Sequence, residues 1–405
     1  MKDQIVVIIG ASHAAAEAVS TLRKKGWQGA IALVGDEPSL PYQRPPLSKA
    51  YYKGEVSAEK LLIKGEHVYE KAEVDLYLGR TAIRINREQK TVELDGGEII
   101  GYSKLILATG TRARLLPIEG ADLPQIHILR TLADVDKIKN LLPDNSKLLI
   151  VGAGYIGLEV AASAVKQGVS VTVLEAMDRV LARVTSPVIS EFYQNVHAQQ
   201  GVDIRLNARL HKFSENADGT HAVMADGEII NFDCAIVGIG VIPNIELAQE
   251  AGLACDNGVL VDEFTRTDDP DIYAVGDCSN HPSLIYDRRI RLESVPNAMD
   301  QAKTAASAIC GDKQVYNQVP WFWSDQYDIK LQTVGLLTDH DEVVVRGNPK
   351  TRKFSAFYLK QNTLIAMDAI NSPAEFMVSK KLVVAGCKPD KARLADSEIS
   401  IKEFL

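Results

Sequence analysis

The chain has 405 residues, 46% of them hydrophobic and 24% charged, which is enough material for two or three hydrophobic cores and excludes a disordered or fibrous protein. The formal net charge of −8 argues against broad affinity for nucleic acid or anionic lipid. The sequence therefore predicts neither a nucleic-acid partner nor a membrane partner.

The first expected element is a strand at residues 5–9, which starts close to the first residue and leads into Gly10. No small-residue cleavage site follows it, so we expect no signal peptide. No stretch reaches the roughly 18 uncharged apolar residues that a membrane helix requires. The five cysteines stand far apart, without C-x-x-C or metal spacing, which is typical of reduced thiols in the cytoplasm and predicts no metal site.

The segment IVVIIGASHAAAEAVSTLR at 5–23 has the context of a dinucleotide-binding turn, a strand followed by a helical pattern. Gly10 occupies the first position of G-x-G-x-x-G, and Ala15 at the third is an accepted variant. Ser12 at the second position is the departure, and it would cost about 1–2 kcal/mol if that position needs a left-handed backbone. A second strand at 31–34 ends near Asp36, where a ribose-binding carboxylate belongs. The alternative is a strand–helix unit that binds nothing.

A second copy of this pattern, LLIVGAGYIGLEVAASAVKQGVSVTVLE at 148–175, begins its turn 142 residues after the first. It has all three glycines, Gly152, Gly154 and Gly157, and its second strand ends at Glu175. Glycines let a pyrophosphate approach the N–H groups at the start of the following helix. Two such turns in one chain predict two bound nucleotides.

Glu175 favours NAD over NADP in the second site. A 2′-phosphate at roughly 4 Å from its carboxylate would be repelled by about 4 kcal/mol at an effective dielectric of 20. The next residues, Ala176 and Met177, are not basic. Arg179 and Arg183 argue against this preference for NAD, because either could bind a phosphate.

Three further apolar runs that close on glycine, at 105–110, 235–240 and 272–277, predict buried strands of parallel sheets that end at ligand-facing turns. From about Pro320 the pattern changes to strands with polar alternation, such as 354–359 and 363–368. The predicted fold class is therefore α/β, with two Rossmann-like dinucleotide-binding domains in a glutathione-reductase-like architecture and a C-terminal α+β domain.

Along nearly its whole length the chain resembles the flavin-dependent ferredoxin reductases of bacterial oxygenase systems, the group of the putidaredoxin and rubredoxin reductases. The segments that carry the resemblance are VGDEPSLPYQRPPLSKAY, LATG, LRTLAD, VGAGYIGLEVA, DIYAVGDC, ESVPNA and PWFWSDQYD. The resemblance implies FAD in the first site and NADH in the second. It divides the chain into a discontinuous FAD-binding domain (1–110 and 241–320), an NAD-binding domain (111–240) and a C-terminal domain (321–405).

The resemblance also implies particular contacts with FAD. Gly10 and Ala14 would bind the pyrophosphate, Asp36 the adenosine ribose, Lys49 the region of the flavin and Arg130 the adenine end. Other cofactor contacts in the two sites are implied at Ser12, His13, Ala15, Arg44, Ala82, Thr109, Gly110, Gly152, Gly154, Tyr155, Ile156, Gly157, Glu175, Arg183, Gly240 and Gly276.

Towards the flavin, the resemblance implies that Asp277 holds the ribityl chain and that Val295 lies at the isoalloxazine ring. The alternative for Asp277 is an ordinary turn aspartate after a strand. A helix is expected from about Pro296, because Pro suits a first turn and alanines recur on one face up to Ile309. Its N-terminal dipole would favour an anionic reduced flavin.

Three residues are catalytic candidates by the same resemblance. Lys53 and Glu159 match the charged pair that borders the nicotinamide and flavin rings, and Trp323 matches a tryptophan beside the flavin on the acceptor side. The alternatives are solvated surface charges for the pair and an ordinary core residue for the tryptophan.

The expected reaction is hydride transfer from NADH to FAD, followed by two single-electron transfers to a [2Fe–2S] ferredoxin or a rubredoxin. Disulfide reductases of this architecture carry a redox-active cysteine pair after the second strand, where this chain has LPYQRPPLSK. A thiol relay is therefore disfavoured. Downstream, the resemblance implies a Rieske oxygenase or a cytochrome P450.

Ferredoxins of this type are acidic, so the cluster Arg288, Arg289 and Arg291 is a candidate docking site, with a solvated strand edge as the alternative. Two other functions stay open. One is an NADH-dependent flavoprotein that reduces a small radical or quinone, similar to monodehydroascorbate reductase. The other is a redox-sensing interaction protein that resembles apoptosis-inducing factor.

Overall fold

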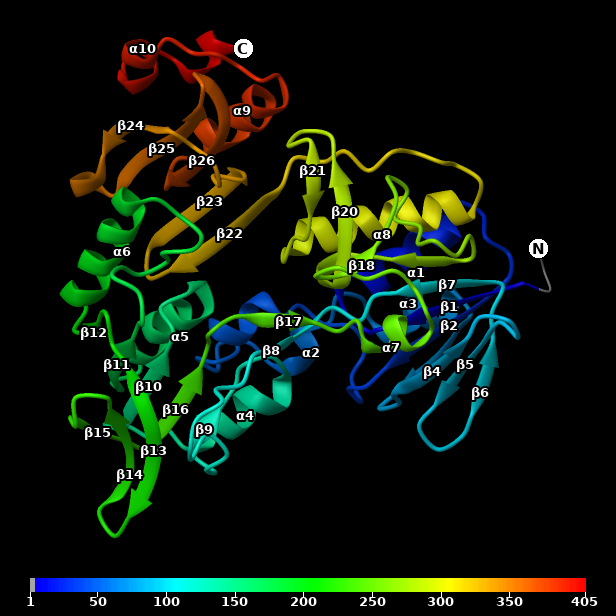
Figure 1. Ribbon diagram of the computed structural model, residues 1–405, viewed down its shortest axis with the longest axis horizontal. Helices are drawn as coiled ribbons and strands as arrows, with labels where there is room; N and C mark the ends of the chain where they lie inside the picture. The colour runs from blue at the N-terminus through cyan, green and yellow to red at the C-terminus, as the bar shows by residue number, and fades with distance from the viewer. Residues whose placement is uncertain (1–3) are drawn as a thin grey trace. The chain divides into compact units, whose positions relative to one another are not determined.

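The computed structural model describes residues 4–405, and these residues form two compact units (Figure 1). Unit 1 consists of residues 4–43, 59–112 and 242–320, and unit 2 of residues 44–58, 113–241 and 321–405. The short helix α2 (Ala58–Leu61) and the strands β8 (Thr111–Ala113) and β17 (Val241–Pro243) lie where the chain passes from one unit to the other.

Unit 1 is built on a five-stranded parallel sheet with the strand order β19-β7-β1-β2-β3. Two three-stranded sheets, β4-β5-β6 and β18-β20-β21, complete it. Its elements are β1 (Ile5–Ile9), α1 (His13–Lys24), β2 (Ala30–Gly35), α3 (Glu66–Lys71), β3 (Val74–Leu78), β4 (Ala82–Asn86), β5 (Thr91–Leu94), β6 (Ile99–Gly101), β7 (Lys104–Leu107), α7 (Glu246–Glu250), β18 (Val259–Leu260), β19 (Ile272–Ala274), η2 (Gly276–Cys278), β20 (Ser279–Ser283), β21 (Arg288–Ile290) and α8 (Val295–Ile309).

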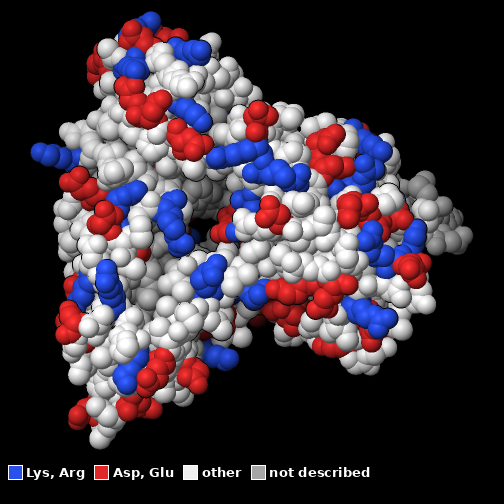
Figure 2. Space-filling model, in the orientation of Figure 1, with Lys and Arg blue, Asp and Glu red and all other residues white. Residues whose placement is uncertain are grey.

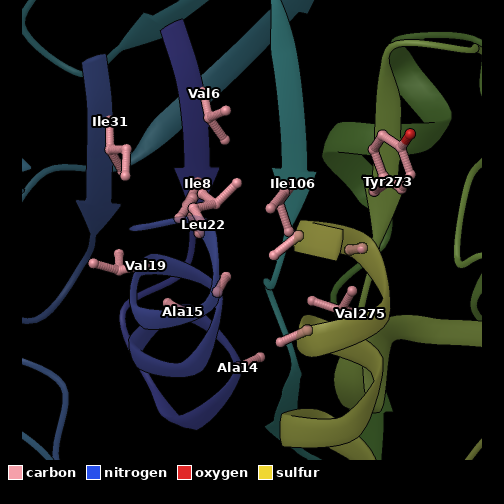
Figure 3. Packing of buried hydrophobic residues seen from close by; sticks show 14 of the residues in the cluster. Val6, Ile8, Ala14, Ala15, Val19, Leu22, Ile31, Ile106, Tyr273 and Val275 are labelled. Atoms are coloured by element: carbon pink, nitrogen blue, oxygen red, sulfur yellow. The ribbon is translucent and has the colours of Figure 1, made fainter. Parts of the chain in front are cut away.

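The main core of unit 1 lies between the parallel sheet and helices α1 and α8. Figure 3 shows branched side chains of the sheet, among them Ile8, Ile31 and Ile106, on the face of the sheet that α1 and α8 cover. The faces of both helices in this cluster are rich in alanine, whose small side chain lets a helix pack close to a sheet. This packing places the N-termini of α1 and α8 within one core.

Unit 2 repeats the arrangement with the five-stranded parallel sheet β12-β11-β10-β16-β9 and an antiparallel sheet, β13-β14-β15. The elements of this part are η1 (Pro45–Ser48), β9 (Ile126–His127), α4 (Leu132–Asn140), β10 (Lys147–Val151), α5 (Tyr155–Val165), β11 (Ser170–Leu174), α6 (Pro187–Gln199), β12 (Asp203–Arg205), β13 (Leu210–Asn216), β14 (Gly219–Met224), β15 (Ile229–Phe232) and β16 (Cys234–Val237).

The C-terminal part of unit 2 is a five-stranded antiparallel sheet in the order β22-β23-β26-β25-β24. Its elements are β22 (Trp321–Gln326), β23 (Ile329–Gly335), β24 (Glu342–Asn348), η3 (Pro349–Thr351), β25 (Lys353–Lys360), β26 (Thr363–Ile370), α9 (Pro373–Val384), α10 (Lys391–Ala395) and η4 (Ile401–Phe404). The sequence prediction of two Rossmann-like regions and an α+β C-terminal region is confirmed.

The expected strands are present but end earlier than the apolar runs that predicted them. The runs at 105–110, 235–240 and 272–277 form strands only to Leu107, Val237 and Ala274, and the chain then turns. Sequence reasoning assigned residues 44–58 to the first domain, whereas the structure packs them in unit 2. The division into three domains at the predicted boundaries remains a prediction.

Candidate functional site

Two glycine turns with nearly the same geometry follow the first strand of each parallel sheet. Gly10 has φ +108° and its N–H donates to Val34 O at 2.8 Å, while Gly152 has φ +106° and its N–H donates to Leu174 O at 2.8 Å. A Cβ added at Gly10 would overlap the carbonyl oxygen of Ala108, and one at Gly152 that of Gly238. Only glycine therefore fits the first position of either turn.

The second position of each turn has an extended backbone. Ser12 has φ −138° and ψ −152°, and Gly154 has φ −78° and ψ 178°. The strain that would follow from a left-handed Ser12 therefore does not arise. A Cβ at Gly154 would meet no atom within 4 Å, so this glycine leaves open space in front of the N-terminus of α5.

The third position explains why the two turns differ. A Cβ at Gly157 would overlap the carbonyl oxygen of Gly152, so the second turn requires glycine there. Ala15, at the same position of the first turn, is fully buried in the core of unit 1, where its methyl group packs. The first turn thus keeps the strand–turn–helix geometry with a different closing contact.

An acidic residue follows the second strand of each parallel sheet. Asp36 is exposed directly after β2. Glu175 follows β11, and its carboxylate accepts hydrogen bonds from Ala153 N at 2.8 Å and Met177 N at 2.9 Å. The Glu175 carboxylate is therefore fixed beside the second glycine turn, at the position expected for recognition of an adenosine ribose.

The two arginines beyond Glu175 differ in what they bind. The guanidinium of Arg179 donates to Thr185 O at 2.9 Å, to Ala182 O at 2.8 Å and to the hydroxyl of Ser190 at 2.6 Å. Those contacts bind Arg179 to its own loop and to the first turn of α6. Arg183 is exposed, and one of its amino groups lies 3.4 Å from Ile239 O.

A buried carboxylate, Glu159 of α5, gathers polar groups from two distant segments. Its Oε2 lies 2.5 Å from Lys49 Nζ and accepts the hydroxyl of Ser48 at 2.6 Å, and its Oε1 accepts the hydroxyl of Ser324 at 2.7 Å. Glu159 is 6% exposed, so one ammonium group balances its charge, and two hydroxyl donors take the place of water at its oxygens.

Glu159 does not form an ion pair with Lys53, the other residue that the resemblance places beside the nicotinamide and flavin rings. Lys53 Nζ lies 2.7 Å from the exposed carboxylate of Glu55, and Lys49 is the residue that pairs with Glu159. Lys49 directly follows the 3-10 helix η1, which directs its side chain towards α5, whereas Lys53 lies one turn of chain further on.

The network extends through side chains that sequence reasoning missed. Gln326 donates to Ser324 at 3.2 Å, and its Oε1 lies 2.8 Å from His197 Nε2. The ring of His197 is fully buried, and this burial lowers its pKa to about 4. Ser48 and Ser324 each adjoin a residue that the sequence did single out, Lys49 and Trp323, and this adjacency was the only signal available.

Predicted residues in unit 1 surround the ends of β7 and β19. The hydroxyl of Thr109 donates to Asn244 O at 2.7 Å, and the hydroxyl of Thr111 donates to Asp277 at 3.2 Å. Val295 begins α8, whose N-cap Ser294 accepts from Asn297 N. The other predicted unit 1 positions lie in the first turn of α1 (His13, Ala14), directly before β8 (Gly110), at the start of η2 (Gly276) and at the start of β4 (Ala82).

In unit 2, Arg44 donates to the carbonyl oxygen of Arg130 at 2.6 Å. Tyr155 begins α5 and its ring packs edge-on against Phe322, with centroids 4.8 Å apart. Ile156, the next residue, is 44% exposed at this helix N-terminus. Gly240 has φ +109°, and a Cβ there would lie 3.6 Å from the guanidinium of Arg183.

Trp323 is half-buried on β22 and pairs with Gln332 of β23. Its ring lies 5.8 Å from that of Trp321, which in turn is covered by the ammonium group of Lys380 at 4.0 Å. Trp323 is therefore neither a fully buried core residue nor a fully exposed surface residue.

The arginine cluster is less available than the sequence suggests. Arg289 of β21 donates to Val261 O at 2.6 Å and to Asn280 O at 2.5 Å. The side chain of Arg291 is 12% exposed and pairs with Glu293 at 2.7 Å. Figure 2 shows acidic and basic side chains intermixed over the face in view, in keeping with the net charge of −8.

Among residues 4–405, no helix is both long enough and apolar enough to cross a bilayer. Within the same described range, no group of three or more His, Cys, Asp or Glu side chains is placed to hold a metal ion.

Comparisons with known proteins cover the whole chain. Residues 4–302 match the family model described as pyridine nucleotide-disulphide oxidoreductase, and residues 321–405 match one described as reductase C-terminal. Rhodocoxin reductase of Rhodococcus erythropolis is 43% identical over 98% of this chain and 93% of its own length. Putidaredoxin reductase of Pseudomonas putida is 41% identical over 99% of this chain and 96% of its own length.

Among solved structures, the crystal structure of a covalent putidaredoxin reductase–putidaredoxin complex superposes with a TM-score of 0.96 at 41% identity. The match covers 100% of this chain and 98% of that one.

Proposed function

The chain belongs to the pyridine nucleotide-disulphide oxidoreductase family, among its ferredoxin reductases, and from that premise we propose that it passes electrons from NADH through FAD to a [2Fe–2S] ferredoxin or a rubredoxin. The observation that carries this proposal is the pair of glycine turns, each followed by an acid after the second strand, in a chain that matches ferredoxin-type reductases over nearly its full length. An oxygenase is the proposed final acceptor.

The residues of the second turn fit NADH. The open space at Gly154 lies in front of the N-terminus of α5, where unpaired N–H groups and the positive end of the helix dipole bind a pyrophosphate. Glu175 is fixed by two backbone N–H groups and would accept hydrogen bonds from the ribose hydroxyls. With Arg179 engaged in its own loop, only Arg183 is left to favour a 2′-phosphate, so the arrangement supports NAD over NADP.

The residues of the first turn fit FAD. The backbone at Gly10 and the first turn of α1 form the second pyrophosphate site, and Asp36 lies exposed after β2 to bind the adenosine ribose. Asp277 and the N-terminus of α8 are the groups of unit 1 that would hold the ribityl chain and the flavin. When bound, FAD accepts a hydride and then releases single electrons. Nicotinamide cannot release single electrons in this way.

The chain's own contribution near the reacting rings is electrostatic and positional. Lys49 and Glu159 form a buried pair whose two hydroxyl donors keep the carboxylate in one orientation. A fixed charge pair of this kind supplies an ammonium group and a carboxylate at set positions without reorganisation. We assign Lys49, rather than Lys53, as the partner of Glu159 in this role.

No sulfur group takes part in the proposed route. All five cysteines are unpaired, and burial raises the pKa of each thiol, so none is poised as a thiolate. Electrons would therefore leave from the flavin edge, with Trp323 on the acceptor side. The unpaired thiols also support a cytoplasmic location.

Three assays on purified protein test the proposal together. We expect a flavin absorption spectrum, its bleaching by NADH, and reduction of cytochrome c that depends on an added [2Fe–2S] ferredoxin. Bleaching with reduction of a quinone or ascorbate radical, and no dependence on ferredoxin, would favour the small-molecule reductase. Slow bleaching with a persistent charge-transfer band would favour the redox sensor. A preparation that FAD cannot reconstitute would contradict the whole proposal.

For docking, we propose that an acidic ferredoxin contacts the β20–β21 hairpin through Arg288, whose side chain is exposed at the start of β21. Arg288→Glu should raise the KM for ferredoxin without changing NADH oxidation by a dye. Arg84→Glu, at an arginine whose side chain is 68% exposed on β4, is the matched control. Equal KM values for the two variants at low salt would remove this hairpin from the interface. Reconstitution with a Rieske oxygenase and with a cytochrome P450 would identify the downstream enzyme.

A further inference from the structure

Asp368 of β26 is a fully buried carboxylate that the proposed reaction does not use. Its oxygens accept the hydroxyls of Thr185 and Thr333 at 2.5 Å each and that of Tyr358 at 2.6 Å. Burial raises the pKa of Asp368, and the three hydroxyl donors act in the opposite direction. Within the described chain these donors are hydroxyls and not a cation, so the carboxyl depends on every one of them.

The three donors come from two different parts of unit 2. Thr333 and Tyr358 belong to the C-terminal sheet, on β23 and β25. Thr185 does not, because it is the last residue but one of the segment 176–186, which leads from Glu175 to helix α6. The Tyr358 hydroxyl also lies 2.9 Å from the hydroxyl of Ser186, from which it accepts, so the C-terminal sheet binds this end of the segment at two adjacent residues.

The segment 176–186 is in turn bound to the second glycine turn. Leu181 N donates to Ala153 O at 3.0 Å, and Arg179 donates to the carbonyl oxygen of Thr185 at 2.9 Å. Leu181 is buried and has φ +54°, a left-handed backbone that a leucine adopts only where its surroundings require it. An unbroken series of hydrogen bonds therefore runs from Asp368 through Thr185 and Arg179 to the segment that contacts Ala153.

We propose that Asp368 is a positioning residue for the nucleotide: through Thr185 it fixes the segment 176–186, and with it Arg183 and the glycine turn, in the conformation that binds NADH. The inference rests on the proposed function only for the identity of the ligand. It assigns the C-terminal sheet a part in nucleotide binding, in addition to its predicted place on the acceptor side.

The test compares two isosteric substitutions, each at a threonine that donates a hydrogen bond to the carboxyl group of Asp368. Thr185→Val and Thr333→Val each remove one hydroxyl donor to Asp368 at the same distance, but only Thr185 belongs to the nucleotide segment. The probe is ADP-ribose, which carries the adenosine and pyrophosphate of NADH and does not react. Its Kd for the FAD-loaded enzyme is measured by calorimetry, and hydrogen exchange is followed in peptides that cover residues 176–186.

We expect Thr185→Val to raise the Kd for ADP-ribose about tenfold, the effect of one lost hydrogen bond to a charged group, and to speed exchange in 176–186. The KM for NADH should rise with it, while kcat with a dye at saturating NADH stays near the wild-type value. Thr333→Val should leave both the Kd and the exchange of this segment within about twofold of the wild type. Thr185→Ser, which keeps the hydroxyl, should restore binding.

Equal effects of the two valine variants on the Kd, or an unchanged Kd in Thr185→Val, would overturn the proposal and leave Asp368 a purely structural group. If Thr185→Val does not fold, a normal Kd in Thr185→Ser together with a weakened one in Asp368→Asn supports the proposal, and unchanged binding in Asp368→Asn refutes it. Failure of the wild-type enzyme to bind ADP-ribose would contradict the proposed function instead. The exchange contrast in 176–186 would still decide whether Asp368 fixes this segment.

Discussion

Replacing Lys49 and Lys53 by methionine, one at a time, tests the assignment of the buried charge pair. Lys49 Nζ lies 2.5 Å from Glu159, with side chains that are 19% and 7% exposed. Lys53 lies 2.7 Å from Glu55, whose side chain is 56% exposed. Removing one partner of a buried pair costs about 3–5 kcal/mol, whereas an exposed pair contributes about 0–1 kcal/mol.

The two hydroxyl donors that remain on Glu159 should keep the cost of Lys49→Met near the lower limit, about 3 kcal/mol of unfolding free energy. We therefore expect the two variants to differ by at least about 2 kcal/mol, although the substitution is chemically the same. The measurement is urea denaturation of the FAD-loaded proteins, followed by tryptophan fluorescence. Trp321 and Trp323 both lie in unit 2, so the signal reports mainly on the unit that contains the pair.

Kinetics supply an independent readout. Reduction of the flavin by NADH, followed by stopped flow, should slow in Lys49→Met and stay near the wild-type rate in Lys53→Met. The reasoning would be refuted if Lys53→Met were the slower or the less stable variant, or if both variants retained wild-type stability. The first result would favour the role that the sequence analysis gave to Lys53, and the second would mean that the network around Glu159 does not need its cation.

Gly154→Ala should raise the KM for NADH but leave the unfolding free energy nearly unchanged, because no atom lies within 4 Å of the added Cβ. Gly157→Ala should destabilise the fold, because its Cβ would overlap a carbonyl oxygen. Equal shifts of the melting temperature in the two variants would count against this geometry. Glu175→Arg should reverse or abolish the preference for NADH over NADPH, because it relieves the repulsion between the carboxylate and the 2′-phosphate, worth about 2 kcal/mol or half of the value at roughly 4 Å. An unchanged preference in steady-state assays would remove Glu175 from the ribose site. The pKa of His197 is lowered by burial to about 4, so the neutral ring contributes stability that is complete above pH 6.5 and is lost as the pH falls towards 4. Between pH 7 and pH 5 the wild type should lose about 2 kcal/mol more than His197→Gln in denaturant titrations, and parallel pH profiles would contradict this.

Much of the candidate site could be predicted from the sequence because it is local. A strand that runs into glycine and then into a helix has one stable geometry, and the two turns repeat it with φ +108° at Gly10 and +106° at Gly152. The acids at 36 and 175 follow their strands by the same local rule. The helix from Val295 was predictable from Pro296 and the alanine spacing, since capping and one-sided packing are properties of a short segment.

What only the tertiary structure decided is which distant side chains meet. The choice of Lys49 over Lys53 depends on the path of η1 against α5, and four residues in sequence are enough to send one ammonium group into the buried network and the other to the surface. The same holds for Ser324 at Glu159 and for Thr185 at Asp368, which lie more than a hundred residues from the carboxylates they contact. Periodicity and spacing predict the backbone conformation within a segment. The hydrogen-bond donors of a buried charge come from separate segments that tertiary packing brings together, and no local sequence pattern specifies which ones they are.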